Sequence, residues 1–233
     1  MNNSLQNEIH SVAREQAILF LNEFSMTDFI GPTIESIVEL KRIHLIYDTI
    51  NDLEAEGFSA SKQGLKFIFI NSNFNLRLQK FTMAHEIYHL DDKIERLAST
   101  IEDERAADHF AANILLPENV VFEKYRSLKK SGYNSLEIFF ALTDLSHVPY
   151  EAMYKRYKEL EISTVDIDKN LKLVKIESRD PYLKQLEQEF QLLRKNPTLS
   201  LSELDQPTYK KAFGKLENLK NHFDQQGRVA DNE

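Results

Sequence analysis

Two histidines four residues apart, with a glutamate directly after the first, are the feature that most restricts how this chain can fold. They lie in the segment HEIYH at residues 85–89. On an α-helix, positions four apart are separated by about 40° around the axis, so His85 and His89 present their imidazoles on one side. Both rings can then bind one metal ion, with Glu86 beside them as a candidate general base. The sequence therefore predicts a helix here, and a metal site on it.

A third ligand is expected from the next helix, predicted over residues 101–115 and ended by Pro117. Three acidic residues begin this helix, Glu102, Asp103 and Glu104, and its periodicity alone leaves all three open as ligands. Glu104 is preferred because Asp108 follows it by four residues, so a ligand and a carboxylate that orients a ligand histidine can share one face. Glu104 also lies one turn before the apolar stripe and is expected to face inward, where an unpaired carboxylate is costly.

The composition restricts both the metal and its setting. The 233 residues include no cysteine, so the site must use nitrogen and oxygen ligands, and the chain has neither disulfides nor a thiolate nucleophile. Two histidines and one carboxylate leave a fourth position open, as in catalytic zinc sites, so Zn2+ is the expected cofactor. A net charge of -8 disfavours direct binding to nucleic acid. Without a secretion signal or an apolar run long enough to cross a bilayer, the chain is expected to be cytoplasmic and independent of membranes.

Periodicity predicts an α+β fold in two parts. Helices are expected from residue 9 to about residue 24, over residues 33–41 and over residues 76–90. Residues 43–47 alternate like a strand, and residues 57–70 have the pattern of a hairpin. These segments predict a small antiparallel sheet next to the helix of the HEIYH segment. We assign residues 1–162 to a mostly helical domain that carries the metal site.

Residues 163–233 are expected to form a helical C-terminal appendage. A strand is predicted at residues 171–176, followed by amphipathic helices around residues 183–193 and 213–223 and by a polar end. One interpretation is a pair of helices that packs on the first domain. The other is a surface for a partner or for a homodimer.

Two blocks of the sequence carry a resemblance to a known family. Residues 80–89 (KFTMAHEIYH) and residues 104–117 (ERAADHFAANILLP) resemble the ImmA/IrrE family of metallopeptidases in order and spacing, and the resemblance covers roughly residues 35–160. It implies an endopeptidase whose protein substrate is a helix-turn-helix transcriptional repressor of a mobile element or stress regulon. Tyr88 replaces the glycine common in the family, and Asp108 replaces asparagine. Neither replacement removes a ligand or the base.

Two functions of different classes are consistent with these residues. In a zinc endopeptidase, Glu86 takes a proton from the attacking water and passes it to the leaving amine, while Asp108 orients one ligand histidine. The alternative is a non-hydrolytic binding module, antitoxin-like or repressor-sequestering, with a structural or vestigial zinc site. Glu86 favours the endopeptidase, because a structural site needs no base. No oxyanion donor is assigned, since on ideal helices neither Tyr88 nor His109 clearly reaches the site.

Overall fold

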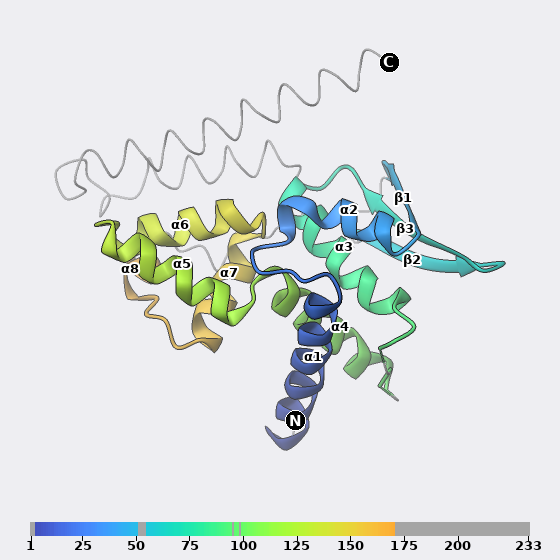
Figure 1. The fold of residues 1–233 in the computed structure, drawn as a ribbon, viewed down its shortest axis with the longest axis horizontal. Coiled ribbons are helices and arrows are strands. Elements are labelled where there is room, and N and C mark those ends of the chain that lie inside the picture. The colour runs from blue at the N-terminus through green and yellow to red at the C-terminus, as the bar shows by residue number, and fades with distance from the viewer. Residues whose placement is uncertain (1–2, 51–54, 95, 98, 171–233) are drawn as a thin grey trace, which may run out of the picture.

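The computed structural model describes residues 3–50, 55–94, 96–97 and 99–170. Within these ranges the chain forms α-helices, one short 3-10 helix and three strands, which confirms the α+β class (Figure 1). In chain order the elements are α1 (Asn3–Glu23), η1 (Gly31–Thr33), α2 (Ile34–Leu40), β1 (Ile43–Asp48), β2 (Gly57–Lys62), β3 (Leu65–Asn71), α3 (Leu76–Leu90), α4 (Thr100–Leu115), α5 (Glu118–Lys130), α6 (Ser135–Ser146), α7 (Tyr150–Glu159) and α8 (Val165–Asn170).

The sheet has the strand order β1-β3-β2, with β3 in the centre. Strands β2 and β3 form the predicted antiparallel hairpin, joined by a two-residue turn. Both turn residues have positive φ, 53° at Gln63 and 79° at Gly64, as in the type I′ turns that match the twist of a hairpin. The prediction of a wholly antiparallel sheet is wrong, however, because β1 runs parallel to β3. Strand β2 lies at the edge opposite β1 and runs antiparallel to both other strands, so the hairpin turn makes β3 run in the same direction as β1.

Helix α3, which carries the HEIYH segment, lies between the sheet and α4 (Figure 1). The side chain of Asn75 caps its N-terminus by accepting a hydrogen bond from the Leu78 backbone N–H at 3.0 Å. The most deeply buried apolar residues of the helix are Met83, Ala84, Ile87 and Tyr88. Leu78, Phe81, His85 and His89 form one stripe along the helix, and this stripe is mostly half-buried. This stripe borders the packed face of α3, which leaves the two histidines accessible at the surface.

Helix α1 packs along α4, and their contact forms a large part of the core. The predicted apolar face of α1 is buried at Ile9, Ala13, Ala17 and Phe20. The predicted stripe of α4 is fully buried at Ala107, Phe110, Ala111, Ile114 and Leu115. The ring of Phe110 lies 5.4 Å from that of Phe20 and 5.6 Å from that of Tyr88, so α4 joins the N-terminal helix to the helix of the two histidines.

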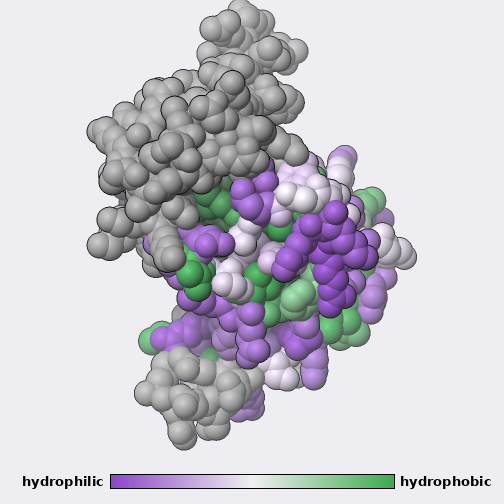
Figure 2. All heavy atoms as spheres, turned by 90° about the vertical axis from the view of Figure 1, so that its left-hand side faces the viewer, coloured by the Kyte–Doolittle hydropathy of each residue, from purple (hydrophilic) through white to green (hydrophobic). Residues whose placement is uncertain are grey.

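Helices α5 to α8 extend the core away from the sheet (Figure 1). At this end of the molecule hydrophilic side chains cover most of the visible surface, with small hydrophobic areas between them (Figure 2). Helix α8 falls within the predicted appendage, and its Ile167 is buried in the core. The strand expected at residues 171–176 and both amphipathic helices expected after it lie outside the described residues. No helix in the described part of the chain is long and apolar enough to span a membrane.

Candidate metal centre

The HEIYH segment lies within α3, and its two histidines point to the same place. The Nε2 atoms of His85 and His89 are 3.1 Å apart. Their side chains are 18% and 16% exposed, so both rings are held by packing while their Nε2 edges remain accessible. This convergence follows directly from the helical spacing of four residues.

Glu104 of α4 completes a cluster of three candidate ligands. Its Oε2 atom lies 3.2 Å from Nε2 of His85, and its Oε1 atom lies 3.4 Å from Nε2 of His89. Bonds of about 2.1 Å in a tetrahedral zinc site place two ligand atoms about 3.4 Å apart. The donor atoms of the cluster therefore have the chemistry and the mutual spacing that zinc requires.

The environment of Glu104 differs from the expectation in one respect. We expected an inward-facing carboxylate, but the side chain is 54% exposed. Water therefore reaches the carboxylate from outside, while its two oxygens face the histidines at 3.2 and 3.4 Å. The prediction of a buried Glu104 is wrong, and burial cost gives no argument for a metal here.

Asp108 lies on the other side of the His85 ring, one turn beyond Glu104. Its Oδ1 atom is 2.9 Å from Nδ1 of His85, the nitrogen that faces away from the cluster. Burial alone would lower the pKa of His85, but the hydrogen bond to Asp108 and the charges of Asp108, Glu86 and Glu104 raise that pKa above its ordinary value. The structure thus brings Asp108 to the position that a carboxylate orienting a ligand histidine would occupy.

Glu86 is the one acidic residue of the HEIYH segment, and it is buried. It is 8% exposed and directly follows His85 on α3. A carboxylate that is largely shielded from solvent and next to a candidate ligand on the same helix remains the candidate general base.

A network around His89 was not foreseen from the sequence. Asp103 accepts hydrogen bonds from the Tyr88 hydroxyl at 3.0 Å, from the Leu97 backbone N–H at 3.0 Å and from Arg96 at 2.8 Å. The same Arg96 guanidinium lies 2.5 Å from Nδ1 of His89 and also donates to the His89 carbonyl. Burial and the bond to Asp103 raise the pKa of Tyr88. Periodicity offered no signal for Arg96, because it belongs to the connection between α3 and α4.

Asp103 also lies near the ring nitrogen of His89 that would carry the proton in a metal-binding tautomer. Burial and the neighbouring His85 lower the pKa of His89, which favours the neutral ring. A metal on Nε2 requires the ring proton on Nδ1. The Oδ2 atom of Asp103 lies 3.8 Å from that nitrogen, which in this structure is contacted by the Arg96 guanidinium. Because a guanidinium only donates, Nδ1 is the acceptor in that contact, and Arg96 must move away before Nδ1–H can donate to Asp103. Asp103 therefore lies on the Nδ1 side of His89, away from the candidate metal position, whereas Glu104 faces the Nε2 atoms of both histidines.

The two residues considered for an oxyanion donor do not serve the cluster. The hydroxyl of Tyr88 is engaged by Asp103, and its ring is fully buried. His109 turns away from the cluster toward His10 of α1, with ring centroids 3.5 Å apart. Neither Tyr88 nor His109 is therefore assigned as an oxyanion donor.

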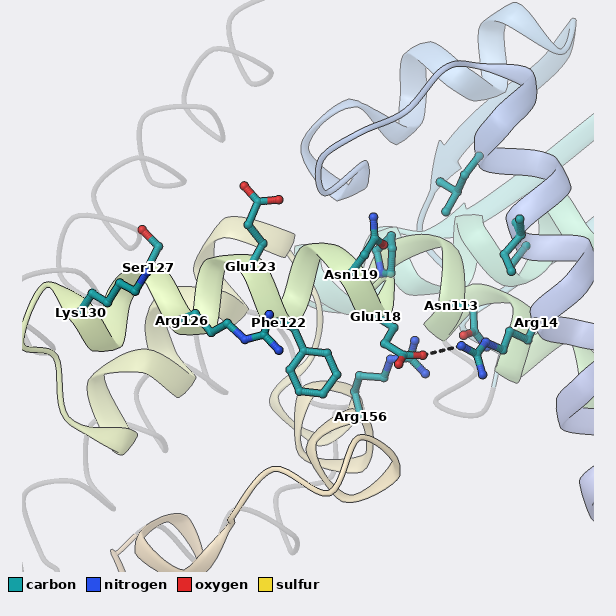
Figure 3. Close-up of a pocket in the computed structure, with 14 residues that line it drawn as sticks. Arg14, Asn113, Glu118, Asn119, Phe122, Glu123, Arg126, Ser127, Lys130 and Arg156 are labelled. Atoms are coloured by element: carbon teal, nitrogen blue, oxygen red, sulfur yellow. Dashed lines mark hydrogen bonds and ion pairs between the residues drawn. The ribbon is translucent and has the colours of Figure 1, made fainter.

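Two cavities lie apart from the cluster. One of about 460 Å³ is lined by Asp108, Leu78 and Phe81 among others, and by none of the three candidate ligands. A larger one of about 760 Å³ lies between α1 and α5 and is lined by none of the three candidate ligands (Figure 3). The candidate site is therefore identified by the donor atoms of His85, His89 and Glu104, because the volume of a cavity does not show whether it binds a metal.

Comparison with models of known protein families assigns this chain to a family. The sequence model described as the IrrE N-terminal-like domain, which defines a family of peptidases, matches residues 39–158, just over half of the chain. The chain belongs to this family. The match confirms the resemblance seen in the sequence, and it includes the HEIYH helix and all of α4. No curated protein matches the sequence significantly.

Membership of the IrrE N-terminal-like family gives the chain a metallopeptidase-like function. The matched region starts in α2 and ends in α7, so it contains the sheet, both helices of the cluster and α5 and α6. Helix α1 lies before the match, yet it packs on α4 within the same core.

Proposed function

We propose that this member of the IrrE N-terminal-like family is a zinc-dependent endopeptidase. The observation that carries the proposal is the approach of two histidine nitrogens and one carboxylate to within 3.1–3.4 Å of one another. Nitrogen and carboxylate donors of this number suit Zn2+ with an open position. His85, His89 and Glu104 are the proposed ligands. Without a metal, the cluster would be only a set of hydrogen-bonded side chains. Such a set would not need a buried carboxylate next to it, whereas a catalytic metal site uses one as a base.

The residues around the cluster supply the acid–base chemistry of peptide hydrolysis. A bound zinc ion would polarise the scissile carbonyl and lower the pKa of a water molecule toward about 7. Glu86 accepts a proton from the attacking water and later donates it to the leaving amine. Asp108 accepts a hydrogen bond from Nδ1–H of His85 and so keeps the Nε2 lone pair directed at the ligand position.

We infer that an extended segment of the substrate adds to the edge of the sheet at β2. This strand pairs with β3 on one side and packs closely on α3, where a Cβ atom at Gly57 would lie 2.7 Å from Cγ2 of Thr82. Thr82 precedes His85 by one turn, so this edge runs next to the cluster. Backbone pairing at a sheet edge supplies affinity without requiring a particular side chain. A proline in the substrate opposite this edge should block cleavage.

The substrate we propose is a helix-turn-helix repressor of a mobile element or stress regulon, cleaved in the cytoplasm. The support is the family resemblance together with the lack of cysteine, which fits a reducing compartment. The acidic net charge favours recognition of the repressor protein over direct binding to its DNA.

New protein N-termini test this proposal. They are compared in native host cells that express the chain or its Glu86→Gln variant, before and after DNA damage. Peptides that appear only with Glu86 identify the substrate and the scissile bond together. Glu102→Gln is the matched control, because it removes an acidic residue at the start of α4 that the structure does not bring into the cluster. Its cleavage pattern should equal that of the unmodified chain.

The alternative is a non-hydrolytic module that binds a repressor and holds a structural zinc ion. Identical N-termini with and without Glu86 under every condition, in a protein that retains zinc, would favour this alternative. The buried position of Glu86 is the observation against it.

A further inference from the structure

A second group of metal-ligating side chains lies about α4, on the side away from the first cluster. His10 of α1, His109 of α4 and Glu159 at the end of α7 each offer one donor atom, and these atoms all lie within 4.8 Å of one another. The three residues come from three different helices. Only the packing of α1 and α7 about α4 brings them together.

The carboxylate of this group is oriented by an anchored arginine. Arg156 is 6% exposed and donates from Nε to the carbonyl of Leu116 at 2.9 Å. From Nη1 it donates to Oε2 of Glu159, also at 2.9 Å. The other oxygen of Glu159 faces Nδ1 of His109 at 3.8 Å, too far for a hydrogen bond. One oxygen is thus fixed and the other is directed at a histidine nitrogen across a gap.

The two rings lie close together, and burial favours a neutral His109. Their ring centroids are 3.5 Å apart, a distance at which two imidazolium charges would repel strongly. Burial and the neighbouring His10 lower the pKa of His109, which favours the neutral, ligating form of that ring. Two imidazoles and one carboxylate are donors that suit first-row divalent metals such as Zn2+.

The group is open to solvent. It borders a cavity of about 570 Å³ lined by His10, Glu159, Arg14 and Arg156 among others. Arg14, Glu118 and Arg156 also line the larger cavity of about 760 Å³ between α1 and α5, which forms a groove along α5. Figure 3 shows these three side chains gathered at one end of that groove, where Arg14 and Glu118 form an ion pair of 2.6 Å. The pairing of Arg14 with Glu118 and of Arg156 with Glu159 offsets the positive charge near the group.

We propose that His10, His109 and Glu159 bind a second divalent transition-metal ion, which ties α1 and α7 to α4. Because His109 directly follows Asp108, the ion would also steady the part of α4 that holds the His85 ring. Arg156 already neutralises the Glu159 carboxylate, so this site is weaker than the first cluster. The proposal concerns stability and metal content, and it does not depend on the first cluster being catalytic.

Zinc content of the full chain tests the proposal. The protein is freed of metal, dialysed against a buffered excess of Zn2+ and analysed for zinc per chain, with far-UV circular dichroism as a check of folding. We expect two equivalents in the unmodified chain, and one in the double variant His85→Ala/His89→Ala. Adding His10→Gln and Glu159→Gln to that double variant should remove the remaining equivalent. Both added positions are exposed, so the fold should tolerate the change.

The matched control is His44→Gln in the same double variant. His44 is an exposed histidine of β1 that belongs to neither cluster, and its replacement should leave one equivalent bound. A folded His85→Ala/His89→Ala variant that holds no zinc would overturn the proposal, whatever the first cluster binds in the unmodified chain. So would a remaining equivalent that survives the changes at His10 and Glu159. A second readout keeps the test independent of stoichiometry, since Zn2+ should raise the melting temperature of the His85→Ala/His89→Ala variant only while His10 and Glu159 are present.

Discussion

Asp108 holds the His85 ring by the nitrogen that faces away from the other candidate ligands. Its Oδ1 atom lies 2.9 Å from Nδ1 of His85, while Nε2 of the same ring lies 3.2 Å from Glu104. A neutral imidazole carries one ring proton, so an Nδ1–H that donates a hydrogen bond to Asp108 leaves the Nε2 lone pair free. Asp108 therefore selects the tautomer of His85 that can bind a metal.

Replacement of Asp108 should weaken zinc binding without abolishing it. Asp108→Ala removes the acceptor from Nδ1, and we expect the affinity of the tighter site to fall by about 10- to 100-fold. Asp108→Asn keeps an acceptor oxygen and should lose less. Competition with a chelator of known affinity measures both variants. An unchanged affinity in Asp108→Ala would mean that this carboxylate does not orient the ligand.

The acidic residues at the start of α4 should differ sharply in their effect on zinc binding. Glu104→Ala removes a carboxylate that faces both histidines, and we expect the tighter zinc site to be lost or weakened by more than in any Asp108 variant. Glu102→Ala should bind zinc like the unmodified chain. Equilibrium dialysis with metal analysis compares the two. The reverse order would assign the third ligand to Glu102.

The hydroxyl of Tyr88 should contribute to stability through Asp103. Tyr88→Phe keeps the buried ring but removes the 3.0 Å hydrogen bond, at a cost of about 1 kcal/mol. For a chain of this size that corresponds to a fall in melting temperature of roughly 2–4 °C. Thermal unfolding of the metal-free protein measures it. An equal melting temperature would show that the bond adds nothing to the folded state.

A side chain at Gly57 should disturb the packing of β2 on α3. A Cβ atom there would lie 2.6 Å from the Phe69 carbonyl oxygen and 2.7 Å from Cγ2 of Thr82, so Gly57→Ala should destabilise the protein by about 1–3 kcal/mol. Ala60→Ser, at an exposed position of the same strand, is the control and should change stability little. Denaturant unfolding compares them. Equal stabilities would show that β2 can move away from α3 at no cost.

Local pattern was enough to predict α1 to α4 and the hairpin, whereas α5 to α7 were not predicted from it. The bounds of α3 and the buried stripe of α4 follow from apolar spacing, and the turn at Gln63 and Gly64 follows from a glycine between two strand-like segments. The direction of β1 relative to β3 was predicted wrongly. A strand sequence does not record which neighbour it pairs with, and that choice is made by the placement of β2 at the far edge.

The order of residues in the chain is enough to bring His85, Glu86 and His89 together, because a spacing of four residues places both rings on one side of any α-helix. The residues that contact them depend on how the helices pack. The angle and offset at which α4 packs on α3 bring Glu104 to the two Nε2 atoms and Asp108 to the outer nitrogen of His85. The meeting of His10, His109 and Glu159 likewise depends on three helices that are distant in the chain. Periodicity determines the side of its own helix on which a residue lies. The packing of the core determines which neighbouring helix that side contacts.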